Sequence, residues 1–141
     1  MGAQASIDTT IAHSLSEIPR VARMVESLGT GHDLSPDVIY DLQLALEEIL
    51  TNVMTHGSTG DRAPHMSIHL TVAHGIVTAE ILDDGEPFNP LDTPRPDLGA
   101  GLRDRSVGGV GILFVRELMD EVEYARVENW NRLVLKRDTR R

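Results

Sequence analysis

The 141-residue chain contains no cysteine, which excludes a disulfide framework and thiolate metal sites. Aromatic residues make up only 4% of the sequence. No apolar run approaches the roughly 20 residues that a membrane-spanning helix needs. The N-terminus, MGAQASIDTT, has neither the basic nor the apolar segment of a secretory signal. Together these absences predict a soluble, cytoplasmic protein that does not contact a membrane.

Basic residues are also scarce, since 13 Lys and Arg face 22 Asp and Glu, for a formal net charge of -9. This balance argues against direct nucleic-acid binding, which needs a clustered basic surface to neutralise phosphates. A nucleotide ligand stays compatible, because Mg²⁺ and backbone N–H groups can carry phosphate charge. There is no G-K-[ST] loop, and the glycines near residue 109 lack the spacing and the βαβ context of a dinucleotide fingerprint.

Length and a hydrophobic share of 40% predict one folded domain over residues 1–141. Periodicity predicts strands at residues 6–13, 66–73, 75–82, 121–127 and 132–136, and helices at residues 16–28, 35–57 and 112–119. Ser16 is a candidate cap for the first helix, and His74-Gly75 predicts a hairpin turn between the second and third strands. This order predicts an α+β fold, a two-layer sandwich of one mixed, mainly antiparallel sheet with helices on one face. The long aperiodic segment from Glu86 to Ser106 is typical of a functional loop or lid.

The helix from Ser35 to Gly57 organises the chain. Ser35 is a natural N-cap, and Pro36 follows at the first helical position. Glu48 and Asn52 lie one turn apart beside its apolar stripe. A carboxylate so placed can take a proton, and an amide oxygen can ligate a hard cation such as Mg²⁺. The alternative is that both are the solvated edge of an amphipathic helix.

Two glycine motifs follow this helix in the chain. Asp83-x-Gly85 ends a predicted strand, where a carboxylate can accept a hydrogen bond from an amino group such as that of adenine. Gly109-x-Gly111 begins a predicted helix, where free N–H groups suit a phosphate. Each motif alone is compatible with an ordinary turn or helix entry. In this order, and with the Glu48–Asn52 pair, they describe an ATP pocket between a helix pair and a sheet.

The histidines at 65, 69 and 74 invite a metal-site interpretation. On a strand, however, His65 and His69 would lie about 13 Å apart at about 3.3 Å per residue, too far to share one ion. A solvated or cross-strand role is the better prediction.

Three segments carry a family resemblance: EEILTNVMTHG, DDGEPFNP and GGVGILFVRELMDEVEY. They resemble the N box, the D-x-G box and the glycine-rich box of the GHKL (histidine-kinase-like, Bergerat-type) ATPase superfamily. The chain is most similar to the small single-domain branch of anti-sigma-factor serine/threonine-protein kinases, from about Ile18 to Lys136.

The resemblance implies roles for individual positions. Glu48 is expected to be the general base and Asn52 the Mg²⁺ ligand. Asp83, with Gly85 beside it, is expected to contact adenine. The residues expected to border the ATP phosphates are Gly109, Val110 and Gly111, and the ATP lid is expected at about residues 92–106, with Arg95, Arg103 and Arg105 as its candidate phosphate cations. The family often has a polar residue beside adenine in its last strand, and Leu133-Val134-Leu135 offers none.

The function that the resemblance implies is phosphorylation of a small STAS-like anti-anti-sigma antagonist by ATP. Release of that antagonist would free the kinase to sequester a bacterial sigma factor and so regulate transcription. A homodimer is also expected from the family. One alternative is a non-catalytic ATP-binding module that regulates by protein binding alone. Another is the catalytic domain of a sensor histidine kinase, which the lack of a helical hairpin bearing a phosphoacceptor histidine disfavours.

Overall fold

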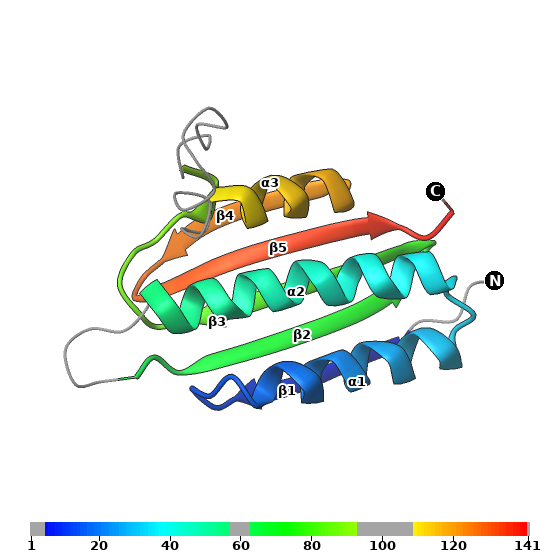
Figure 1. Ribbon diagram of the computed structural model, residues 1–141, viewed down its shortest axis with the longest axis horizontal. Coiled ribbons are helices and arrows are strands. Elements are labelled where there is room, and N and C mark those ends of the chain that lie inside the picture. The colour runs from blue at the N-terminus through cyan, green and yellow to red at the C-terminus, as the bar shows by residue number, and fades with distance from the viewer. Residues whose placement is uncertain (1–4, 57–62, 93–108, 141) are drawn as a thin grey trace.

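The computed structural model describes residues 5–56, 63–92 and 109–140 (Figure 1). The predicted element order is confirmed. Its elements are β1 (Ala5–Ile11), α1 (Glu17–Gly31), α2 (Pro36–His56), β2 (Met66–Ala73), β3 (Ile76–Asp83), the 3₁₀ turn η1 (Pro90–Asp92), α3 (Gly109–Leu118), β4 (Glu121–Val127) and β5 (Trp130–Asp138).

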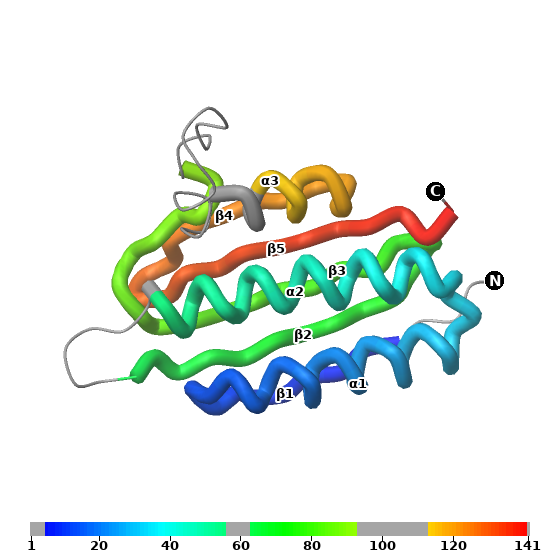
Figure 2. The backbone as a smooth tube through the Cα atoms, in the orientation of Figure 1, coloured from blue at the N-terminus to red at the C-terminus, as the bar shows by residue number. Residues whose placement is uncertain are grey.

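The five strands form one sheet in the order β1-β2-β3-β5-β4, and every described pair is antiparallel. The three helices lie side by side on one face of this sheet, with α2 in the middle (Figure 1). The tube view follows how β5 returns between β3 and β4, so that segments far apart in sequence become neighbours (Figure 2). The predicted α+β two-layer sandwich is therefore confirmed, but the sheet is antiparallel in all its described pairs and not mixed, because β5 returns beside β3 in the opposite direction.

Helix α2 begins as its sequence predicts. The Ser35 hydroxyl accepts a hydrogen bond from the backbone N–H of Val38 at 3.2 Å, which makes Ser35 the N-cap. The helix is buried along a wide face because it packs on the sheet and also contacts α1 and α3. Its buried apolar residues are Val38, Leu42, Ala45, Leu46, Ile49, Leu50 and Met54. Burial of each large side chain among them contributes about 1.5–3 kcal/mol.

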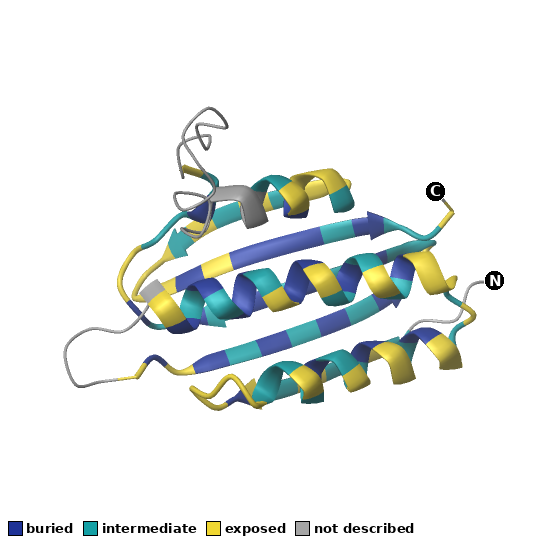
Figure 3. Cartoon of the chain, in the orientation of Figure 1, coloured by how far each residue is buried: buried dark blue, intermediate teal, exposed yellow. Residues whose placement is uncertain are grey.

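Strands β2 and β3 alternate strictly between buried and half-buried residues, as a sheet with one covered face requires (Figure 3). They form the predicted hairpin. His74 and Gly75 both have positive φ, at 55° and 75°, the geometry of a type I′ turn, whose twist matches that of the flanking strands.

Helix α1 starts differently from the prediction. Ser16 makes no side-chain cap hydrogen bond and already has helical dihedrals. Instead the Glu17 carboxylate accepts a hydrogen bond from the N–H of Ala12 at 2.8 Å and holds Arg20 through both of its oxygens. Arg20 and Ala12 thus lower the pKa of Glu17 to about 2.

Some predictions fall outside the described residues. The expected lid at about residues 92–106, with Arg95, Arg103 and Arg105, lies there apart from Asp92, and so does Gly57. Among the helices of the described ranges, none is long and apolar enough to cross a membrane.

Candidate functional site

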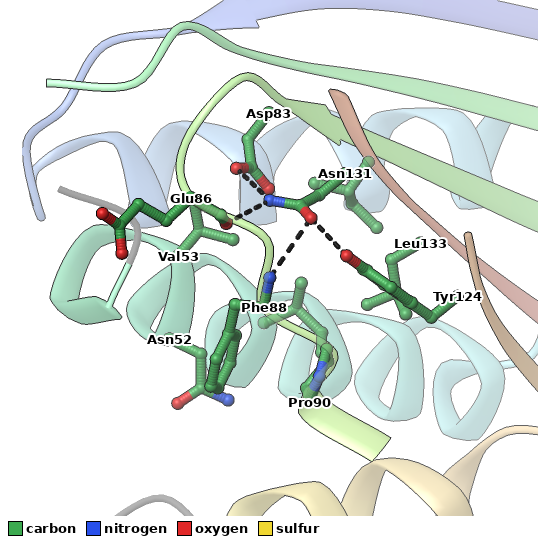
Figure 4. Close-up of a pocket in the computed structure, with 11 residues that line it drawn as sticks. Asn52, Val53, Asp83, Glu86, Phe88, Pro90, Tyr124, Asn131 and Leu133 are labelled. Atoms are coloured by element: carbon green, nitrogen blue, oxygen red, sulfur yellow. Dashed lines mark hydrogen bonds between the residues drawn. The ribbon is translucent and has the colours of Figure 1, made fainter. Parts of the chain in front are cut away.

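A pocket opens between α2 and the ends of β3 and β5 (Figure 4). It is narrow, with a cavity volume of about 20 Å³. We call it the Asp83 pocket, and its lining residues are Ile49, Asn52, Val53, Ile81, Asp83, Glu86, Phe88, Pro90, Tyr124, Asn131 and Leu133. It combines an apolar wall with a few polar groups, the composition of a site for a small organic ligand.

Asp83 is the last residue of β3 and is 5% exposed. Its Oδ1 accepts hydrogen bonds from the N–H of Gly85 and from Nδ2 of Asn131, both at 3.0 Å. Burial raises the pKa of the Asp83 carboxyl, and these two hydrogen bonds partly oppose the rise. Within the described residues Oδ2 has no hydrogen-bond partner. Asp83 therefore offers the pocket a fixed acceptor.

Asn131 holds this acceptor in place, and the sequence interpretation did not identify it. It lies directly opposite Asp83 in the β3–β5 ladder and is 5% exposed. Besides donating to Asp83, its Nδ2 donates to the carbonyl of Glu86 at 2.8 Å. Its Oδ1 accepts from the Phe88 N–H at 3.3 Å and from the Tyr124 hydroxyl. The amide thus ties the D-x-G turn to β4 and β5 (Figure 4).

The signal for Asn131 was present in the sequence. Side chains alternate along a strand, so Asn131 and the pocket residue Leu133 point to the same face. The prediction considered only residues 133–135, and this range begins two positions after Asn131.

A residue of β4 also hydrogen-bonds to the D-x-G turn. Nη1 of Arg126, from β4, donates to the carbonyl of Gly85 at 2.8 Å. Both backbone groups of Gly85 are therefore engaged, the N–H by Asp83 and the carbonyl by Arg126. The turn is a preorganised part of the pocket wall.

Asn52 reaches the same pocket from α2 and is 7% exposed. In the part of the chain that the structure describes, nothing hydrogen-bonds to its side-chain amide. The polar atoms of this amide are therefore available to a ligand or to water. Its oxygen fits a hard cation such as Mg²⁺ when a phosphate supplies further oxygens. No group of three or more acidic or histidine ligands occurs among the described residues, so a cation here would need such a phosphate.

Glu48 lies one turn before Asn52 and faces a second hollow, between α2 and α3. This α2–α3 groove is open to solvent and has a volume of about 500 Å³. It is lined by Leu44, Glu47, Glu48, Thr51, Phe114, Val115 and Leu118. Burial raises the pKa of the Glu48 carboxyl, and repulsion from the Glu47 carboxylate adds to the rise. A carboxylate with a raised pKa is a stronger proton acceptor. Asn52 and Glu48 thus serve neighbouring hollows.

Gly109 is the first residue of α3, and Gly111 lies in its first turn, as the sequence predicts. The side chain of Val110 is outside the described residues. Helix α3 is fixed beside the Asp83 pocket because Nη2 of Arg116 donates to the carbonyl of Leu91, next to the pocket residue Pro90, at 3.0 Å.

His69 has the predicted cross-strand role, His65 lies just before β2, and His74 lies in the β2–β3 turn. His69 lies opposite Asp8 in the β1–β2 ladder and hydrogen-bonds to its carboxylate. His65 hydrogen-bonds to Asp84 through Nδ1 at 2.9 Å.

Comparison with known proteins identifies the fold family. The profile of the histidine kinase-like ATPase domain matches residues 11–137. The serine/threonine-protein kinase BtrW of Bordetella bronchiseptica is 29% identical over 96 residues, covering 68% of this chain and 68% of the kinase. The serine-protein kinase RsbW of Bacillus subtilis is 33% identical over 98 residues, covering 66% of this chain and 59% of the kinase. The match therefore spans about three fifths of the length of RsbW.

Solved structures show the same architecture. The RsbU and RsbW domains of a Mycobacterium tuberculosis protein align over 95% of this chain and 32% of that chain, with a TM-score of 0.69 and 15% identity. The histidine kinase domain of a blue-light-activated kinase from Erythrobacter litoralis aligns over 89% of this chain and 61% of that chain, with a TM-score of 0.55 and 15% identity. At such identity these structures support the fold alone. The profile match over residues 11–137 is decisive, and the chain belongs to the histidine kinase-like ATPase domain family, whose members bind ATP.

Proposed function

We propose that this protein is an ATP-dependent serine/threonine-protein kinase of the anti-sigma type. It transfers the γ-phosphoryl group of ATP to a serine or threonine of a small STAS-like anti-anti-sigma antagonist, and it sequesters a sigma factor once that antagonist is released. Homology to kinases named RsbW and BtrW supports the reaction class. The observation that carries the proposal is the placement of Asn52 and Glu48, one turn apart on α2, in adjoining hollows.

The Asp83 pocket would hold the adenine ring once its lining side chains move apart, because the cavity of about 20 Å³ is smaller than the ring. The free Oδ2 of Asp83 can accept a hydrogen bond from the exocyclic amino group, and Gly85 keeps the turn open beside it. Ile49, Val53 and Leu133 supply an apolar surface for the ring faces. Because Asn131 fixes Oδ1 of Asp83, the second carboxylate oxygen is oriented before any ligand binds.

The triphosphate would run from this pocket past Asn52 toward the N-terminus of α3. Asn52 would ligate Mg²⁺, which neutralises charge on the phosphate oxygens. Gly109, Val110 and Gly111 would present backbone N–H groups at the positive end of the helix dipole. This backbone site suits an acidic chain, since it binds phosphate with few lysines.

Glu48 would act as the general base. Its carboxylate takes the proton of the acceptor hydroxyl while the hydroxyl oxygen forms a bond to the γ-phosphorus. The bond between that phosphorus and the β–γ bridging oxygen breaks, and ADP leaves with the electron pair. Positioning and electrostatics supply most of the acceleration in such transfers.

Calorimetric titration of ATP and Mg²⁺ tests the nucleotide site. Wild type should bind ATP with Mg²⁺ dependence, and Asn52→Ala should bind more weakly and lose that dependence. The matched control is Asn129→Ala, at an exposed turn between β4 and β5. Equal Mg²⁺ dependence in wild type and Asn52→Ala would exclude the assigned role of Asn52.

Glu48→Gln separates the kinase from its alternative, a non-catalytic ATP-binding partner switch. With radiolabelled ATP and a cognate antagonist, Glu48→Gln should bind ATP normally and transfer phosphate at least about 100-fold more slowly, the usual contribution of a general base. Glu26→Gln, an exposed change on α1, should behave as wild type. If neither wild type nor the variants label any antagonist while all bind ATP, the partner switch is the function.

A further inference from the structure

The α2–α3 groove is lined by large apolar side chains that are exposed to solvent. The large exposed apolar residues of the described chain are Leu15, Tyr40, Leu44, Phe114, Val127 and Trp130. Two of them, Leu44 at 36% and Phe114 at 61% exposure, line this groove. Tyr40, at 60%, lies one turn before Leu44 on the same face of α2. Exposed apolar side chains clustered in a hollow typically mark a binding site.

The charged residues that line the groove are acidic. Glu47 is exposed and Glu48 half-buried, and both line the same hollow as Leu44 and Phe114. Arg116, on α3, donates to the Leu91 carbonyl, away from this hollow. The groove therefore combines an apolar floor with negative charge, which favours an apolar segment flanked by a basic residue.

The position of Glu48 also indicates which ligand enters the groove. Glu48 lies inside the groove, so a hydroxyl that gives up its proton to Glu48 must enter this hollow. ATP is expected on the other side, in the pocket reached by Asn52. The groove is therefore the side from which an acceptor must approach.

We propose that the α2–α3 groove is the docking site for the phosphoacceptor protein. It binds the segment that carries the acceptor serine or threonine, with an apolar side chain of that segment against Leu44 and Phe114 and a basic side chain near Glu47. This inference rests on the proposed kinase function and adds to it the surface that selects the substrate. The apolar contact provides affinity for the acceptor protein, and Glu48 accepts the proton of the acceptor hydroxyl.

Two substitutions test the groove with little risk to folding, because both side chains are substantially exposed: Leu44→Asp and Phe114→Asp. The control is Leu15→Asp, the same change at a 63% exposed leucine before α1. The probes are the STAS-domain proteins encoded in the source genome, each purified and incubated with radiolabelled ATP. ATP affinity is measured in parallel, and thermal unfolding checks that each variant is folded.

We expect wild type and Leu15→Asp to phosphorylate one such protein with the same KM. Leu44→Asp and Phe114→Asp should raise that KM at least about tenfold, with ATP affinity unchanged. Unchanged KM in both groove variants would overturn the docking site and leave the kinase function intact. Loss of ATP affinity in them would assign the groove to nucleotide binding and also overturn it. If wild type binds ATP but labels none of the STAS proteins, the proposed kinase function itself is wrong.

Discussion

The hydrogen-bond network around Asn131 gives the most demanding test of the site. Asn131→Ala removes one bond to a carboxylate, one to a backbone carbonyl, one from a backbone N–H and one from the Tyr124 hydroxyl. A hydrogen bond to a charged group contributes about 1.5–3 kcal/mol and each neutral one about 0.5–1.5 kcal/mol. Water can enter from the pocket and replace part of this sum. We therefore expect a loss of about 2–3 kcal/mol in the free energy of unfolding.

Urea unfolding followed by circular dichroism measures this loss directly, and the melting temperature should fall by about 5–10 °C for a domain of this size. Affinity for ATP should also fall, by about tenfold or more, because Asp83 loses the group that orients its carboxylate. Asn129→Ala is the matched control, since Asn129 is exposed in the same β4–β5 hairpin and should change stability by less than about 0.5 kcal/mol.

In Asn131→Ala, stability and ATP affinity should fall together, because both depend on the same hydrogen-bond network. If the variant unfolds like wild type and binds ATP with the same affinity, the network does not preorganise the turn, and the assigned role of Asn131 is refuted. If stability falls while ATP affinity holds, Asn131 is structural only, and the pocket orients Asp83 by other means.

Three further substitutions test the physical account. Burial raises the folded-state pKa of Asp83, so its ionised form destabilises the fold at pH above that pKa. Asp83→Asn should therefore unfold at a higher urea concentration than wild type at pH 8, and this advantage should shrink as pH falls through the folded pKa and vanish below about pH 4. Gly29→Ala should lose about 1 kcal/mol in urea unfolding, since the added Cβ would lie 2.5 Å from Cγ1 of Ile39. Asp41→Ala should lose about 3 kcal/mol, because it removes a carboxylate 3.0 Å from the buried guanidinium of Arg137, and Asp41→Ala with Arg137→Met should recover most of that loss in the same assay.

Local signals in the sequence predict most of the fold. The Ser35 cap, the period-two alternation of residues 66–83 and the turn at His74 and Gly75 each depend on a few adjacent residues, and all agree with the structure. Ser16 was a wrong prediction, because a serine before an apolar helix has the same local pattern whether or not its hydroxyl bonds. The nearby Glu17 binds Ala12 and Arg20 instead, which the local pattern does not reveal.

The site residues also divide into those that local sequence motifs predict and one that depends on strand pairing. Glu48, Asn52 and Asp83 belong to short contiguous motifs, so sequence alone could nominate them. Asn131 acts through a partner 48 positions away in the chain, and only the β3–β5 register brings the two together. A polar residue in a strand is ordinary until its cross-strand neighbour is known.

The geometry of α2 explains why a single helix can serve both hollows. Four residues carry an α-helix about 40° past a full turn, so Glu48 and Asn52 point in related but different directions. The packing of α2 on the sheet fixes the rotation of the helix, which directs Asn52 into the Asp83 pocket and leaves Glu48 toward α3. The neighbours of Glu48 are unsuited to its role, since Glu47 is exposed and Ile49 is 2% exposed in the core. Of the two carboxylates that line the groove, only that of Glu48 is partly buried. A base needs both properties, because burial strengthens it and access lets the acceptor hydroxyl reach it.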